Sequence, residues 1–245
     1  MSVRFTTFLL TISALVLGLG CGGSTSGEPS IPQEVPCVRG SEGFAASVWE
    51  FAIEDYEAAD AEDPPVPGSI VFVGSSSILF WSTLHEDMAP LPVLNRGFGG
   101  SEIAHVTHFA DRIVLPYEPS AIVLYAGDND IGFGSSAGCA LHDFEAFFDH
   151  IRAAAPDTPI YFISIKPSPA RWELWDEMRR ANQLIEARMT TDPALHFIDV
   201  SEAMLDDQAQ PRGELFLEDG LHMTPAGYQL WTSIVRPRLE ADLGY

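Results

Sequence analysis

The sequence predicts a single α/β domain built around a five-stranded parallel sheet, and two patterns support this prediction. Short, almost uninterrupted apolar runs, typical of strands buried on both faces, lie at residues 70–73, 91–94, 121–125, 160–165 and 195–198. Segments with apolar residues at helical spacing separate these runs. Strands that alternate with helices form parallel sheets whose faces the helices cover. The 245-residue chain is 46% hydrophobic and 20% charged, which is an ordinary globular composition.

Helices are expected on both sides of these strands. Residues 41–59 form an amphipathic segment before the first strand, and its apolar positions are Phe44, Val48, Phe51 and Ile53. Two later segments each present one apolar helix face, formed by Phe144, Phe147, Phe148 and Ile151 in the first and by Leu174, Met178, Ala181 and Ile185 in the second. The last helix begins at Thr224, a good capping residue that Pro225 follows at the first helical position. Its expected core residues are Leu230, Trp231, Ile234 and Val235.

The charge balance excludes two classes of partner. The chain carries 13 Lys and Arg residues against 35 Asp and Glu residues, for a net charge of −22. A protein that binds nucleic acid needs a basic surface to displace counterions, and docking on anionic lipid needs the same. Three cysteines without a CxxC pair give neither a disulfide scaffold nor a zinc site. The composition leaves the oligomeric state open.

The N-terminus has the pattern of an export signal. The uncharged, apolar stretch from residue 5 to 20 is shorter than the roughly 20 residues of a membrane-spanning helix. It ends at Cys21 and resembles the signal of bacterial lipoproteins, whose cysteine is lipidated, although Gly18 stands where that pattern prefers leucine. We therefore expect residues 1–21 to be a signal peptide, 22–40 a flexible linker and 41–245 the folded domain. The alternative is plain secretion without an anchor. If Cys21 is lipidated, the lipid anchor is the only contact with a membrane that we expect.

Export also makes a disulfide between the remaining cysteines plausible. If Cys21 is lipidated, Cys37 and Cys139 form an even pair in an oxidising compartment. Cys37 lies in an arm that has little else to hold it, which favours a bridge. Two separate buried thiols are the alternative.

Polar residues that follow the five strands suggest where chemistry takes place. Ligands of open parallel sheets bind beyond the carboxyl ends of the strands. The segments that follow the strands are Gly74-Ser75-Ser76-Ser77, Asn95-Arg96-Gly97-Phe98-Gly99-Gly100-Ser101, Gly127-Asp128-Asn129-Asp130, Lys166-Pro167-Ser168-Pro169-Ala170-Arg171-Trp172 and Asp219-Gly220-Leu221-His222. Together they supply a nucleophile, oxyanion donors, a base and a group to orient the base, which is the set that acyl transfer requires.

The order of these segments resembles the SGNH (GDSL-type) hydrolase family over roughly residues 68–239. Gly74-Ser75-Ser76 stands where that family has Gly-Asp-Ser, and Gly100 matches its oxyanion glycine. Gly127-Asp128-Asn129-Asp130 and Asp219-x-x-His222 match its third and last blocks. The resemblance implies a three-layer α/β/α, flavodoxin-like fold. Ser75 replaces the usual aspartate beside the nucleophile, which changes the charge of the turn.

The resemblance also implies the roles of the matching residues. Ser76 is the expected nucleophile, His222 its base and Asp219 the residue that orients the imidazole. The N–H groups of Ser76 and Gly100 and the side-chain amide of Asn129 are the expected oxyanion donors. No metal or organic cofactor is required. Apart from the resemblance, we expect substrate contacts from Ser75, Arg171 and Trp172, which lie in the loops at the strand ends.

Each of these residues also has a simpler interpretation. The three serines can cap a helix, the glycines can permit a positive φ, and Asn129 and Asp219 can serve turns. Arg96, Lys166, Arg171 and Trp172 can be ordinary loop residues. The other histidines lie in helical or strand patterns without a partner motif, which favours surface or packing roles.

Competing motifs match less well. The nucleophile elbow of α/β-hydrolases needs a second glycine, and Ile78 stands in that position. A dinucleotide fingerprint starting at Gly97 has Glu102 where its third glycine belongs. A calcium loop starting at Asp128 has its glycine one position early, at Gly132.

The sequence thus predicts an exported serine esterase that acts on small-molecule esters with short acyl or acetyl groups. Carbohydrate deacetylases, thioesterases and lysophospholipases of the same fold are the alternatives within the class. A non-catalytic binding module is the alternative outside it, and loss of Ser76, Asn129 or His222 would mark such a module. None of the three is lost.

Overall fold

The computed structural model describes residues 35–40 and 45–245. The predicted signal peptide, Cys21 and most of the predicted linker lie outside the described residues, as does Phe44.

A five-stranded, fully parallel sheet forms the centre of the fold, as the sequence predicts. Its strands β1 to β5 lie in the order β2-β1-β3-β4-β5, with bounds Ile70–Gly74, Val93–Gly97, Ala121–Tyr125, Ile160–Ile163 and Leu195–Ile198. Gly74, Gly97 and Tyr125 lie level with one another at the carboxyl ends of the first three strands. The chain adds β2 on one side of β1 and then builds the sheet in the other direction from β3. This reversal places the topological switch point between β1 and β3, where such sheets bind ligands.

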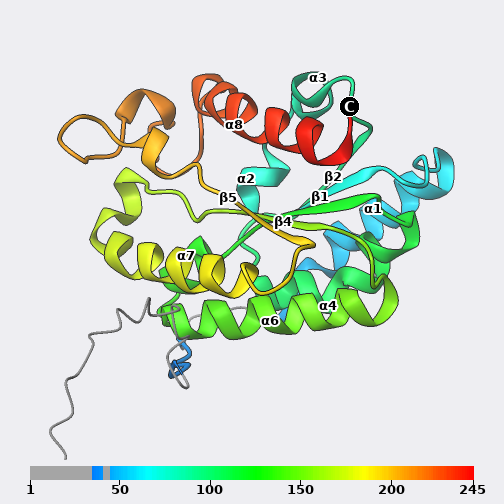
Figure 1. The fold of residues 1–245 in the computed structure, drawn as a ribbon, viewed down its shortest axis with the longest axis horizontal. Coiled ribbons are helices and arrows are strands. Elements are labelled where there is room, and N and C mark those ends of the chain that lie inside the picture. The colour runs from blue at the N-terminus through cyan, green and yellow to red at the C-terminus, as the bar shows by residue number, and fades with distance from the viewer. Residues whose placement is uncertain (1–34, 41–44) are drawn as a thin grey trace, which may run out of the picture. The chain divides into compact units, whose positions relative to one another are not determined.

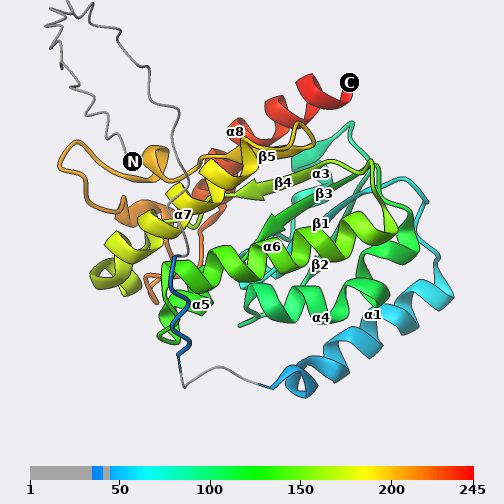
Figure 2. The same cartoon turned by 60° about the horizontal axis from the view of Figure 1, so that its bottom comes forward.

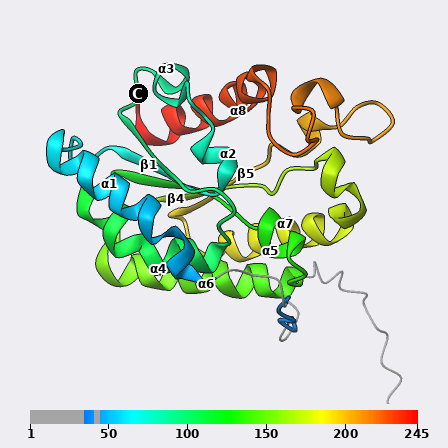
Figure 3. The ribbon, with the colours of Figure 1, turned by 180° about the vertical axis from the view of Figure 1, so that it is seen from behind.

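Helices cover both faces of the sheet, so the predicted three layers are present. The structure has α1 to α8 at Glu50–Glu62, Ser76–Leu79, Leu84–Met88, Ile103–Ile113, Asp128–Gly132, Ala137–Ala154, Trp175–Met189 and Pro225–Leu243. Its 3₁₀ helices η1 to η5 are at Ala46–Trp49, Leu115–Tyr117, Pro169–Leu174, Glu202–Met204 and Gly213–Leu215. Helices α2, α3 and α8 pack on one face, and α1, α4, α6 and α7 on the other (Figures 1 and 3). Figure 2 brings α4 and α6 in front of the strands.

Two predicted helix patterns agree with the structure in detail. Phe144, Phe147 and Ile151 of α6 are fully buried, as the predicted face requires. Thr224 caps α8 by accepting the N–H of Gly227 at 3.3 Å. None of the helices within the described ranges combines the length and apolar character that crossing a membrane requires.

The helix predicted before the first strand is present, but the prediction of which of its faces is buried is wrong. Val48 and Phe51 are 59% and 74% exposed, whereas Ile53 is buried. Polar anchors on the helix and the preceding 3₁₀ turn set its rotation: the Trp49 indole N–H donates to the Gly99 carbonyl at 2.7 Å, and the Tyr56 hydroxyl to the Gly97 carbonyl at 2.5 Å. These residues lie at helical spacing with Ile53, so that side of the helix faces the sheet.

Four strand boundaries also differ from the prediction. The first strand ends at Gly74 rather than at residue 73, and the second ends at Gly97 rather than at residue 94. The second strand starts at Val93 rather than at residue 91, because Leu91 closes the turn after α3 by donating its N–H to the Met88 carbonyl. The fourth strand ends at Ile163, two residues before the end of its apolar run. Ile165 bonds instead to the side chain of Asn182.

The segment from residue 35 to 40 is attached to the domain by covalent and polar contacts. Cys37 and Cys139 form a disulfide with an S–S distance of 2.07 Å. Arg39 donates two hydrogen bonds of 2.6 Å to the buried carboxylate of Asp143. The Gly40 N–H donates to the hydroxyl of Ser135. The start of α6 therefore holds this part of the predicted linker in place.

Candidate active site

The turn between β1 and α2 presents Ser76 at the carboxyl edge of the sheet. Gly74 has a φ of +143°, and a Cβ there would lie 1.8 Å from the carbonyl oxygen of Tyr125, so only glycine fits. The Ser75 N–H donates to that same oxygen at 3.0 Å. The chain then enters α2, whose first residue is Ser76. The turn thus places the Ser76 hydroxyl at a helix N-terminus, which favours developing negative charge.

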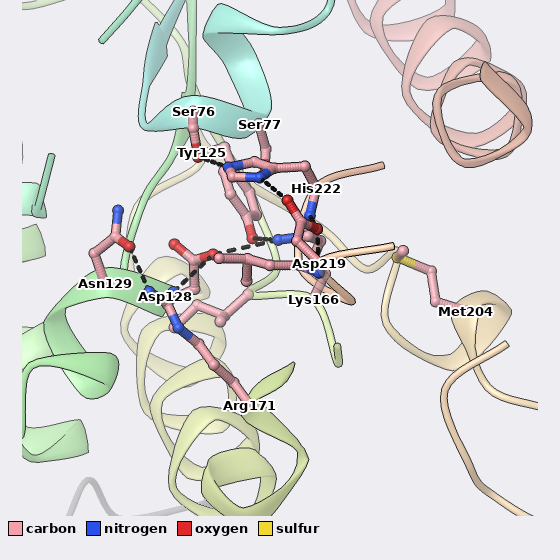
Figure 4. Close-up of polar contacts among 12 residues, drawn as sticks. Ser76, Ser77, Tyr125, Asp128, Asn129, Lys166, Arg171, Met204, Asp219 and His222 are labelled. Carbon is pink, nitrogen blue, oxygen red and sulfur yellow. Dashed lines mark hydrogen bonds and ion pairs between the residues drawn. The ribbon is translucent and has the colours of Figure 1, made fainter. Parts of the chain in front are cut away.

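Ser76, His222 and Asp219 form a continuous hydrogen-bonded chain (Figure 4). His222 Nε2 lies 3.0 Å from Ser76 Oγ, and its Nδ1 lies 2.6 Å from Asp219 Oδ2. Asp219 Oδ1 also accepts the backbone N–H groups of Leu221 and His222. These three donors lower the pKa of Asp219 to about 2. An ionised Asp219 holds the imidazole with Nε2 toward the serine, which is the geometry of a general base.

The turn after β2 lies beside the nucleophile. A Cβ on Gly99 would lie 3.9 Å from the Cβ of Ser76, and Gly100 adopts a φ of +77°. Within the described part of the chain, the N–H groups of Ser76 and Gly100 have no hydrogen-bond acceptor. They are therefore available to a substrate oxygen.

Asn129 contacts the segment that follows this turn. It lies in α5, directly after β3, and its Nδ2 donates to the Ser101 carbonyl at 3.0 Å. Its Oδ1 accepts a hydrogen bond of 2.8 Å from Arg171 Nη2. Because Arg171 has only donors, it fixes which end of the amide is the oxygen. The second Nδ2 hydrogen is left for an oxyanion.

A buried charge cluster anchors Arg171. Its Nη1 lies 3.3 Å from Asp128 Oδ2, and the same carboxylate oxygen accepts from Lys166 Nζ at 3.2 Å. Lys166 also donates to the Tyr125 hydroxyl, and its side chain is only 1% exposed. Burial works against the charge of Asp128, but the two cations outweigh it and hold the pKa of Asp128 below its ordinary value. Arg171 is the member of this cluster that bonds to Asn129 (Figure 4).

Asp130 responds to its surroundings in the opposite way. It is buried, and one of its oxygens accepts the Ile103 N–H at 3.2 Å. Burial and then the neighbouring carboxylate of Glu102 raise the pKa of Asp130 to about 8. The pKa values of Asp128 and Asp130, two acids of one short helix, are thus shifted in opposite directions, because Lys166 and Arg171 contact Asp128 whereas burial dominates at Asp130.

The residues expected to contact substrate do not all reach the surface of the site. Ser75 is fully buried beneath it, which corrects the expectation that this side chain lines the substrate site. Arg171 bonds to Asn129, and Trp172 lines a cavity along α7 whose lining contains neither Ser76 nor His222. The sequence did not lead us to predict that Lys166 and Asp128 pair with each other. The one signal for it was that Lys166 is the only lysine in the chain and directly follows a buried strand.

The arrangement can perform acyl transfer with its own side chains. It has a nucleophile, a base with an orienting carboxylate, and three groups placed to donate to an oxyanion. Within residues 35–40 and 45–245, no cluster of histidine, cysteine or carboxylate side chains has the geometry to hold a metal ion.

The chain is similar to known proteins over most of its length. The model of the GDSL-like lipase/acylhydrolase family matches residues 69–230. Platelet-activating factor acetylhydrolase IB subunit alpha1 of Bos taurus is 24% identical over 180 residues, which cover 69% of this chain and 73% of that protein.

Solved structures share the fold. A GDSL-like lipase of Bacteroides thetaiotaomicron has a TM-score of 0.66 at 20% identity and covers 79% of this chain and 100% of its own. A family 3 carbohydrate esterase of Clostridium thermocellum has a TM-score of 0.58 at 16% identity and covers 72% of this chain and 96% of its own.

Proposed function

Because this chain belongs to the GDSL-like lipase/acylhydrolase family, we propose that it is a serine esterase for small esters with short acyl or acetyl groups. The observation that carries the proposal is the hydrogen-bonded chain from Asp219 through His222 to Ser76. Ser76 Oγ attacks the ester carbonyl while His222 Nε2 takes the hydroxyl proton. The resulting oxyanion accepts from the N–H groups of Ser76 and Gly100 and from Asn129 Nδ2.

Collapse of this intermediate breaks the bond to the alcohol oxygen, and His222 returns the proton to the leaving alcohol. Ser76 then carries the acyl group as an ester. Water attacks that ester with His222 as the base again, which releases the carboxylic acid and restores the serine. Asp219 orients the imidazole throughout and stabilises its charged form.

A small cavity beside the nucleophile supports the preference for short acyl groups. It has a volume of about 240 Å³ and is lined mainly by Leu79, Phe98, Gly99, Ala52 and Tyr56. The lining also includes Asp55, and Ser76 is not part of it; Gly99 is the lining residue next to the nucleophile, since a Cβ there would lie 3.9 Å from the Ser76 Cβ. An acetyl or short aliphatic group fits such a place, which disfavours a lysophospholipase with long chains.

A series of nitrophenyl esters from acetate to dodecanoate tests the proposal, run beside acetylated sugars and an acyl thioester. We expect kcat/KM to be highest for acetate or butyrate and to fall steeply for chains of eight or more carbons. A maximum at long chains would contradict the short-chain proposal. Absence of turnover together with absence of fluorophosphonate labelling would favour the non-catalytic binding module.

We also propose that the protein is exported and lipidated at Cys21. The apolar run before Cys21 supports this, and the Cys37–Cys139 disulfide is typical of an oxidising compartment. Mass spectrometry of the protein from a bacterial membrane fraction tests it. An acylated Cys21 at the mature N-terminus is expected, and an unacylated N-terminus elsewhere would leave plain secretion.

A further inference from the structure

Residues 36–40, which we call the strap, run along the segment that joins α5 to α6 (Figure 2). The Val38 N–H donates to Ser136 Oγ at 3.0 Å, and the Ser136 N–H donates back to the Val38 carbonyl at 2.8 Å. The Gly40 N–H donates to Ser135 Oγ at 3.1 Å. The strap is therefore bonded to the two residues that precede α6, in addition to the disulfide and the ion pair that attach it to α6 itself.

The strap packs so closely against this connection that glycine is needed on both sides of the contact. A Cβ on Gly40 would lie 1.8 Å from the carbonyl oxygen of Phe133, and a Cβ on Gly138 would lie 2.3 Å from that of Pro36. A larger residue at either position would force the two segments apart. Phe133 directly follows α5 and Gly138 lies in the first turn of α6, so the strap contacts both ends of the connection.

The same connection is bonded to α5, the helix that carries Asn129. The Ser135 N–H donates to the Asp130 carbonyl at 2.9 Å, and the Phe133 N–H donates to the Asn129 carbonyl at 2.8 Å. Ser135 thus receives the strap with its hydroxyl group and holds α5 with its N–H. Because α5 has only five residues, contacts with its surroundings rather than its own helical bonds fix its position.

Helix α5 in turn holds the segment that follows the Gly100 turn. Asn129 Nδ2 donates to the Ser101 carbonyl at 3.0 Å, and Asp130 Oδ1 accepts the Ile103 N–H at 3.2 Å. An oxyanion donor must lie within about 2.7–3.1 Å of the oxygen that it stabilises, so a displacement of α5 by about 1 Å would weaken catalysis. A continuous series of contacts therefore leads from the strap to the oxyanion side of the site.

We propose that the strap positions Asn129 for catalysis, with Arg39 and Ser135 as positioning residues. Arg39 anchors the strap on α6 through its two hydrogen bonds to Asp143, and Ser135 passes the contact on to α5. The proposal rests on the proposed esterase function and adds to it a control of the oxyanion donor.

The disulfide makes this control sensitive to reduction. Cys139 is fully buried, but Cys37 is exposed, so a dithiol in solution can attack the bridge at the Cys37 sulfur. Two electrons and two protons then pass from the dithiol to the two cysteines, which become thiols, and the dithiol becomes a disulfide. The activity should therefore depend on the redox state of the bridge.

Reduction of the folded wild-type protein with dithiothreitol tests the proposal. We expect kcat for nitrophenyl acetate to fall by about three- to tenfold with KM nearly unchanged, the size typical of coupling through such contacts. Active molecules are counted by fluorophosphonate labelling to completion, so that unfolded protein does not lower kcat. Cys37→Ala should show the same loss without reductant, and dithiothreitol should then have no further effect. In the Asn129→Ala background, reduction should leave kcat unchanged.

Variants of Arg39 test the anchor, with Arg188 as the matched control. Arg188 bonds to Glu145 of α6 at 3.2 Å, as Arg39 bonds to Asp143 of the same helix, but it reaches α6 from α7. Arg39→Met should lower kcat by about the same factor as reduction, and Arg39→Lys should restore part of it. Arg188→Met should leave kcat unchanged.

Hydrogen exchange of residues 128–136, measured by mass spectrometry, reports on α5 without any turnover. Reduction should make this exchange faster. If the oxidised protein neither hydrolyses nitrophenyl acetate nor reacts with a fluorophosphonate, the proposed function fails, and the exchange result decides by itself whether the strap holds α5. In an active enzyme, a kcat that reduction leaves unchanged would overturn the proposal. A loss of kcat that persists in the Asn129→Ala background would also overturn it.

Discussion

The two halves of the candidate site are built in opposite ways. The relay half, Ser76 with His222 and Asp219, is open to water: the side chain of His222 is 24% exposed and that of Asp219 is 48% exposed. The oxyanion half is buried: Asn129 is 5% exposed, and Arg171, which bonds to it, pairs with Asp128, whose side chain is also 5% exposed.

The two halves also differ in how their geometry is fixed. Asp219 and His222 are three residues apart and hold each other within one loop, so the loop itself sets their geometry. Asn129 and Arg171 are 42 residues apart and meet only in the folded chain. Changes in the relay half should therefore affect catalysis with little cost in stability. Changes beneath Asn129 should affect both.

The largest effect is expected in the relay half. Ser76→Ala and His222→Ala should each lower kcat by about 10⁴- to 10⁶-fold, and the double variant should lose no more, because nucleophile and base act as one unit. Initial rates with nitrophenyl acetate measure this. Ser76→Ala should also abolish fluorophosphonate labelling, whereas Ser77→Ala should keep it. Normal activity in Ser76→Ala would refute the assignment of the nucleophile.

The next effect tests the buried half through stability. Lys166→Met leaves Asp128 with Arg171 as its one remaining cation, so the free energy of unfolding should fall by about 3 kcal/mol. Urea unfolding measures it. The matched control, Arg180→Met, removes an exposed cation and should change the same quantity by less than about 0.5 kcal/mol. Equal effects of the two variants would show that the buried cluster is not a structural unit.

Removal of the amide donor should lower kcat, and it should also lower the free energy of unfolding, because the Ser101 carbonyl and Arg171 Nη2 lose their partner. Asn129→Ala should lower kcat by about 10²- to 10³-fold, since one oxyanion donor is lost. Fluorophosphonate labelling should continue, but slowly, because Ser76 and His222 remain. An unchanged kcat would assign Asn129 to the turn rather than to the oxyanion.

A smaller effect tests whether Arg171 acts through Asn129. Arg171→Lys keeps a cation near Asp128 but loses the planar fork that reaches both residues. We expect kcat to fall about tenfold, the value of one well-placed hydrogen bond, with KM nearly unchanged. In the Asn129→Ala background the same change should have almost no effect on kcat. A full tenfold loss in that background would show that Arg171 acts independently of Asn129.

The smallest effect is the contribution of Asp219 to stability in acid. Its pKa in the folded protein is about 2, below the ordinary 3.8, so ionised Asp219 stabilises the fold above about pH 4, and this is lost as the pH falls through 2. Because the group is exposed, Asp219→Asn should lower the free energy of unfolding by less than about 1 kcal/mol at pH 7. Urea titrations from pH 2 to 7 measure it. A difference that remained undiminished at pH 2 would contradict the assignment.

Local patterns carried most of the prediction that the structure confirms. The apolar runs gave all five strands, and the bounds of two of them, 121–125 and 195–198, agree to the residue. The prediction was less accurate where a hydrogen bond outweighs the apolar pattern. Trp49 and Tyr56 rotate the first helix away from its predicted face, and Leu91 joins a turn rather than the second strand.

By itself, the sequence determined the alternation of strands and helices and the order of the short polar motifs at the strand ends. Both follow from local spacing, and parallel topology then brings the strand ends to one edge. Only the tertiary structure decided that Arg171 orients Asn129, that Lys166 pairs with Asp128, and that Ser75 lies beneath the site. These contacts join segments about 40 residues apart, and burial gives them their strength. Neither separation in space nor loss of water can be seen in a linear pattern.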